Sequence, residues 1–126
     1  MAFRSGRFIV PLTGVAATTG GAIGAVLNPE GAPIIIEKVT LYVTTPSTGA
    51  ANINVGTAAD GITDNSGLIS ALAINGSITG KAYNGLNPAA KAEHVVLGAT
   101  EYITATGSAT SVGFAGFLAV DYTRVS

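Results

Sequence analysis

The sequence predicts an all-β protein, an antiparallel β-sandwich of about seven or eight short strands. Three observations favour this fold class. Helical periodicity is nearly absent, while Gly, Thr, Val and Ile dominate the chain. Turn residues recur every 8–15 positions. Apolar and polar residues alternate in the clearest segments, and such one-sided strands are buried when two sheets pack face to face.

The expected connections between the strands are jelly-roll-like. An immunoglobulin-like order stays open as an alternative, although the Cys, Trp and Cys signature of that fold is missing from a chain with no Cys and no Trp. Residues 7–126 are expected to form the single sandwich domain, and residues 1–6 an N-terminal arm.

The first strand is expected at residues 7–13, and it should lie at a sheet edge because Pro11 has no N–H for a neighbouring strand. A Gly-, Ala- and Thr-rich loop at 14–21 leads to a second short strand at 22–27. The sequence Asn-Pro-Glu-Gly at 28–31 then predicts a turn, since Pro sets φ at its second position and Gly closes it.

The strongest strand signal covers residues 33–45. Apolar residues occupy odd positions in 39–43 but even positions in 34–36. One extra residue near Glu37 reconciles the two halves, and this predicts a β-bulge. A turn at 46–49 follows.

The next segments alternate between clear and ambiguous patterns. Residues 51–57 predict a strand with Ile53 and Val55 inward, and residues 58–67 predict a loop. The segment 68–74 fits either a strand or one helical turn. Residues 75–92 form a long irregular stretch, which is typical of functional or mobile loops.

Three strands are expected in the C-terminal part of the chain. They cover residues 93–97, 101–106 and 113–124. Their alternation predicts one inward-facing set, formed by Val95, Leu97, Ile103, Ala105, Phe114, Leu118, Val120 and Tyr122.

Charge and composition exclude several classes of function. Six basic and seven acidic residues give a net charge of -1, and charged residues make up 10% of the chain. This balance lacks the positive potential that nucleic acids or anionic lipids attract, so neither is expected as a partner. So few charges favour association with copies or partners, because much of the surface is then suited to an interface.

Catalytic motifs are missing, and we expect no enzyme activity and no cofactor. The single histidine, His94, follows Glu93 at the start of an expected strand, and no serine stands in a Gly-x-Ser-x-Gly motif. The seven acids are scattered over separate turns and strands, which gives no sign of a paired carboxylate site.

A weak calcium candidate is formed by Asp60, Asp64 and Asn65, which share a glycine-containing loop. Calcium prefers several oxygen ligands of this kind. The spacing does not match an EF-hand, and Asp and Asn are equally typical of turns that bond their own backbone. We therefore expect no metal, with this loop as the alternative.

Candidate interface residues are Arg4, Arg7 and Tyr83. The two arginines near the N-terminus suit an acidic partner surface, or a solvated tail. Tyr83 lies in the long irregular stretch and would suit a glycan or receptor site.

No membrane segment or leader is expected. Residues 8–29 lack charge, but they include Pro11 and several glycines, unlike a spanning helix. The apolar run after Arg7 ends at Pro11, which is too short for a signal peptide. The chain is therefore expected to be made in the cytoplasm of its host.

The run at 25–60 resembles small proteins of tailed bacteriophages that are encoded near the major capsid protein. The resemblance rests on Asn-Pro-Glu-Gly at 28–31, Thr-Thr-Pro-Ser-Thr-Gly-Ala-Ala at 44–51 and Val-Gly-Thr-Ala-Ala-Asp at 55–60. A similar Tyr-Ile-Thr-Ala-Thr element stands at 102–106. These are patterns of turns and strands, with no catalytic signature.

The resemblance implies a capsid decoration, cement or minor head protein, a β-sandwich that is frequently trimeric. The expected function is a virion structural protein at the capsid surface, with the major capsid protein and its own copies as partners. The alternative is a glycan- or receptor-binding module of a phage fibre or tail.

Overall fold

The computed structural model describes residues 3–84 and 95–125 of the chain. These residues form nine β-strands and no helix, so none of their segments is a helix that could cross a membrane. The strands are β1 (Phe3–Thr13), β2 (Gly21–Leu27), β3 (Ile34–Thr45), β4 (Asn52–Ala58), β5 (Ile69–Ala73), β6 (Ala82–Asn84), β7 (Val95–Leu97), β8 (Tyr102–Gly107) and β9 (Ala115–Val125).

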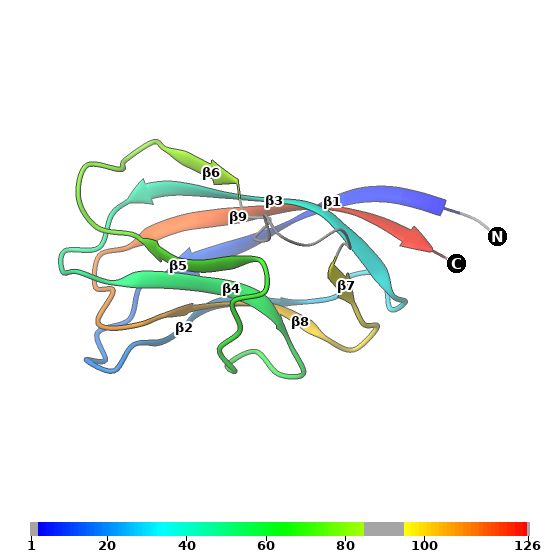
Figure 1. The fold of residues 1–126 in the computed structure, drawn as a ribbon, viewed down its shortest axis with the longest axis horizontal. Coiled ribbons are helices and arrows are strands. Elements are labelled where there is room, and N and C mark those ends of the chain that lie inside the picture. Colours follow the sequence, from blue (N-terminus) through cyan, green and yellow to red (C-terminus); the bar gives the residue numbers. More distant parts are fainter. Residues whose placement is uncertain (1–2, 85–94, 126) are drawn as a thin grey trace.

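The strands form two antiparallel sheets that pack face to face (Figure 1). Sheet A has the order β1-β9-β3-β6, and β7 also pairs with β3. Sheet B has the order β2-β8-β4-β5. The pairs are nested in sequence, β1 with β9, β2 with β8, β3 with β6 and β7, and β4 with β5. This nesting is the jelly-roll order, and it confirms the predicted sandwich.

The part of the chain that the structure describes has nine strands rather than the predicted seven or eight, because two short strands, β6 and β7, share the position beside β3 in sheet A. β7 pairs with Ile34–Ile36 of β3, and β6 pairs with Thr40–Tyr42 of the same strand. Both therefore lie along one side of β3. The segment 68–74, which fitted a strand or a helical turn, contains strand β5.

Two local predictions for sheet A are confirmed. β1, which contains Pro11, is an edge strand. The register between β3 and β9 shifts between Ile36 and Lys38, which places a bulge at Glu37. β1 begins at Phe3 rather than at residue 7, so residues 3–6 of the expected arm pair with β9 of the same chain.

The core lies between the inner faces of the two sheets. The alternating positions predicted from β3, β4 and β9 supply nearly half of it, and the other strands and loops supply the rest. Its largest fully buried side chains are Phe114, Ile34, Ile36, Leu41, Ile53, Leu68, Ile74, Leu97, Ile103, Leu118, Val10 and Val39. The two sheets approach closely at one corner, where a Cβ on Gly24 of β2 would lie 2.4 Å from the carbonyl oxygen of Pro11. A side chain at that position would therefore push β1 and β2 apart.

Candidate functional site

The outer face of sheet B is covered by the chain's own loop between β4 and β5. The side-chain amide of Asn54 and the hydroxyl of Thr106 both donate to the carboxylate of Asp64 in that loop. The side chain of Asn65 lies so close to Gly56 that an added Cβ would meet its oxygen at 1.9 Å. The loop is visible below β4 and β8 in Figure 1, on the side away from sheet A.

This cover changes the environment of β8. Ile103 and Ala105 face the core as predicted, and Thr104 and Thr106 point to the other side of the sheet. Both threonines are nevertheless buried, because the loop lies over them. The β8 strand therefore has two buried faces.

The outer face of sheet A carries large apolar side chains that are exposed in the part of the chain that the structure describes. The register places Pro11, Phe117 and Tyr42 side by side across β1, β9 and β3. The rings of Tyr42 and Phe117 stack at a centroid distance of 5.2 Å. Next to this row lies Ile9, which is 47% exposed. Side chains directly opposite one another on neighbouring strands share one face of the sheet, so these four form one surface.

A row of charges crosses the same face. The register aligns Arg7 of β1, Asp121 of β9 and Lys38 of β3. Beyond this row, the exposed Val96 of β7 lies opposite Ile35. We call the outward side chains of these rows the A face: Arg7, Ile9, Pro11, Ile35, Lys38, Tyr42, Val96, Phe117 and Asp121.

The apolar patch of the A face is a surface that water solvates poorly. Phe117 is 36% exposed and Ile9 is 47% exposed, whereas the exposed Val96 lies apart from them, beyond the row of charges. A contiguous exposed apolar patch on a sheet is typical of a protein-protein contact. The A face is therefore the candidate interface of this chain.

Arg7, one of the predicted interface residues, lies on the A face. Its guanidinium group donates to both carboxylate oxygens of Asp121, from Nε and, at 3.3 Å, from the terminal nitrogen. This hydrogen bonding lowers the pKa of Asp121 below its usual value, and Lys38 adds a smaller effect in the same direction. The pair holds Arg7 in place across the face, with its side chain 65% exposed.

The other predicted interface residues lie elsewhere. Tyr83 belongs to strand β6 rather than to a loop, opposite the buried Leu41, and it packs against the core. Its ring therefore packs against the core, and the expectation that Tyr83 lies in an irregular stretch is corrected to a position in a short strand. The backbone of Arg4 pairs with Arg124, and its side chain lies outside the described residues. His94 lies outside them as well.

The three calcium candidates use their oxygens for separate purposes. Asp60 accepts from the N–H groups of Ile62 and Thr63, which is a turn that bonds its own backbone. Asn65 accepts from the N–H of Gly67, whereas Asp64 contacts sheet B. In the described part of the chain, no three His, Cys, Asp or Glu side chains gather in a way that could hold a metal ion.

Acid unfolding tests the carboxylates that these contacts stabilise. Hydrogen bonds lower the pKa values of Asp60, Asp64 and Asp121, so these groups bind protons more readily in the unfolded chain. Their contribution to stability is complete above the unfolded pKa and is lost as the pH falls through the folded values. We expect the urea midpoint to be flat above about pH 5 and to fall below about pH 4.

The control for this prediction is Asp121→Asn. Because Asn does not titrate, the variant should show a shallower fall of the midpoint than the wild type in the same buffers. Two results would contradict the assignment of this pH dependence to the Arg7–Asp121 ion pair. One is a urea midpoint that rises as the pH falls, and the other is a fall of the midpoint with pH that is the same in Asp121→Asn as in the wild type.

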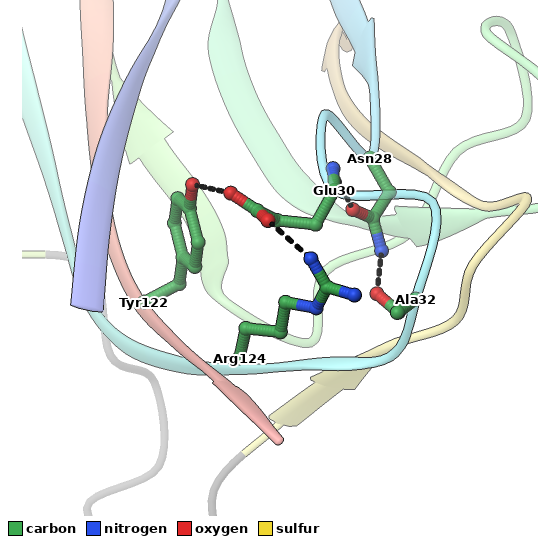
Figure 2. A network of polar contacts seen from close by, with 5 residues as sticks. All are labelled: Asn28, Glu30, Ala32, Tyr122 and Arg124. Atoms are coloured by element: carbon green, nitrogen blue, oxygen red, sulfur yellow. Dashed lines mark hydrogen bonds and ion pairs between the residues drawn. The ribbon is translucent and has the colours of Figure 1, made fainter. Parts of the chain in front are cut away.

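A polar cluster ties the turn between β2 and β3 to the end of β9 (Figure 2). The carboxylate of Glu30 accepts a hydrogen bond from the hydroxyl of Tyr122 at 2.5 Å and one from the guanidinium group of Arg124 at 3.2 Å. Asn28 holds the turn itself, since its amide donates to the carbonyl oxygens of Ala32 and Gly98 and its oxygen accepts from the N–H of Glu30. These groups bond to one another within the chain, which makes the cluster structural, although the buried Nε of Arg124 has no hydrogen-bond partner among the described residues.

We compared the chain with known proteins, and no family model, curated protein or solved structure matches it.

The sequence did not predict the apolar residues of the A face as a candidate site. One of them, Phe117, could have been recognised from the sequence, because it is a large apolar residue at an outward position of its strand. Its partner Tyr42 lies far away in the sequence, so their stacking required the sheet.

Proposed function

We propose that this chain is a non-catalytic structural protein that decorates or cements a phage capsid through the A face. The observation that carries the proposal is the exposed apolar surface around Phe117 and Ile9, next to a row of charges on the same face of sheet A. The resemblance of residues 25–60 to small phage head proteins supplies the partner, a shell of the major capsid protein. The localisation that follows is the capsid surface of a virion.

Energetics support such a role. Burying the A face removes apolar surface from water, at about 25 cal/mol for each Å². The strands hold its side chains in one arrangement, and a preorganised surface loses little entropy on binding. Many copies on one lattice further strengthen a weak individual contact.

The proposed oligomer is a homotrimer, which fits a threefold position on a capsid lattice. Light scattering behind a sizing column tests it directly. A stable trimer would support the threefold arrangement, whereas a monomer at high concentration would mean that the chain attaches through shell contacts only.

The experiment that tests the function uses shells of the parent phage that lack this protein. Purified chain is added to these shells, and binding is measured by co-sedimentation, with shell stability measured by thermal disruption. We expect saturable binding and a higher disruption temperature. The proposal is wrong if the protein stays in the supernatant and the shells are no less stable without it.

A further inference from the structure

A hollow of about 330 Å³ opens on the side of sheet B, away from the A face. It lies between the β4–β5 loop, Thr19 of the β1–β2 loop and the strands beneath them. Its lining combines the polar side chains of Asn54, Asp64, Thr106 and Ser108 with the apolar side chain of Ile62. Small-molecule sites share its volume and its convergent polar groups.

The carboxylate of Asp64 is held in a fixed position within the hollow. Thr106 and Asn54 donate to it from two neighbouring strands, β8 and β4. Asn54 is itself fixed, because its oxygen accepts from the N–H of Ala71 at 2.7 Å. Ala71 has a φ of 52°, the one positive value among the described non-glycine residues. The strained backbone thus supports the side chain that orients Asp64, a pattern found at functional sites.

The hollow keeps hydrogen-bonding capacity for a ligand. Oδ1 of Asp64 takes the closer bonds from Thr106 and Asn54, whereas Oδ2 has only a 3.4 Å contact with Asn54. The Oγ of Ser108 accepts from the N–H of Asn52, so its hydroxyl proton can be donated to a ligand. A fixed acceptor therefore lies near a donor.

The chemistry of these groups favours a neutral polyol. Neighbouring hydroxyls of a sugar ring can donate to Asp64 and accept from Ser108. The side chain of Ile62, 73% exposed, offers an apolar contact to the C–H groups of the same ring. A divalent cation would want several oxygen ligands with charge, and Asp64 is the single carboxylate among the described residues of the lining.

We propose that this hollow binds a saccharide ring, with Asp64 as the hydrogen-bond acceptor, Ser108 as a donor and Ile62 as the apolar wall. The site lies on the opposite side of the sandwich from the A face. A chain attached to a shell through the A face would therefore present the hollow outward. The proposal does not depend on shell binding, because the isolated chain carries the whole site.

The test is an NMR titration of the ¹⁵N-labelled chain with free monosaccharides. The panel contains glucose, galactose, mannose, rhamnose and N-acetylglucosamine, each up to about 50 mM, which covers the millimolar affinities of small sites. We expect at least one sugar to shift the signals of Gly21, Gly107 and the Asn54 side chain in a saturable way, with the amides of the A face unchanged.

Variants assign the binding to the named residues. Asp64→Asn keeps an oxygen for Thr106 but removes the charge, and it should weaken sugar binding at least about tenfold. Ile62→Ser, at a side chain that is mostly solvent-exposed, should weaken it severalfold with no effect on folding. Asp121→Asn, on the A face, is the matched control and should bind as the wild type does.

Three results would overturn the proposal. One is the absence of any saturable shift with the whole panel. Another is that calcium chloride or methylammonium chloride shifts the same signals while no sugar does, which would make the hollow a cation site. The third is sugar binding that both Asp64→Asn and Ile62→Ser leave unchanged. Shell binding measured separately keeps this outcome distinct from the proposed function.

Discussion

Phe117→Asp is expected to reduce binding to the protein-free shells at least about a hundredfold. The ring lies at the centre of the apolar row on the A face, stacked on Tyr42. An acid there would have to be buried without a partner when the face meets a shell, and an unpaired buried charge is costly. A central aromatic residue is also the kind of side chain that dominates the energy of an interface. Co-sedimentation over a range of protein concentrations measures the loss.

The chain offers a matched control in Ile62→Asp. This variant makes the same apolar-to-acid change at a more exposed side chain, on the opposite side of the sandwich. It should bind the shells as the wild type does, with an unfolding midpoint close to that of the wild type. Phe117→Asp loses the stacking on Tyr42 and should unfold at a lower urea concentration, so its midpoint is measured to show that it is folded under the conditions of the binding assay. If Ile62→Asp loses binding and Phe117→Asp does not, the side of sheet B faces the shell and the A face is not the interface.

Glu30→Ala is expected to lower the free energy of unfolding by about 2–3 kcal/mol. The carboxylate is only 12% exposed and takes hydrogen bonds from Tyr122 and Arg124, whose side chain is 26% exposed. Removing Glu30 leaves a guanidinium group and a hydroxyl without their acceptor in a largely buried place (Figure 2). Urea unfolding followed by circular dichroism measures the change.

Two further variants separate the contributions to that loss. Glu30→Gln keeps an acceptor for Tyr122 but loses the charge opposite Arg124, so it should cost less than Glu30→Ala. Tyr122→Phe combined with Glu30→Ala should cost less than the two single changes together, since both remove the same hydrogen bond. Additive losses in this double-mutant cycle would show that the bond contributes nothing measurable to stability.

The local elements of this protein follow from its sequence. Pro11 predicted an edge strand because a residue without an N–H cannot pair on both sides. The change of apolar parity within residues 33–45 predicted the bulge at Glu37, because an added residue is the way a strand restores its inward face. The alternation along β3, β4 and β9 likewise named nearly half of the core. Each of these inferences rests on neighbours in the chain.

Only the tertiary structure decided which surfaces are open and which residues meet. The sequence marked residues 58–67 as a loop, but it took the fold to place Asp64 on Thr106, 42 positions later, and so to cover sheet B and leave sheet A exposed. Glu30 meets Tyr122 across 92 positions. Tyr83, expected in a loop, was drawn inward by pairing with β3. Periodicity reports on side chains a few residues apart, whereas these contacts depend on how the sheets are stacked.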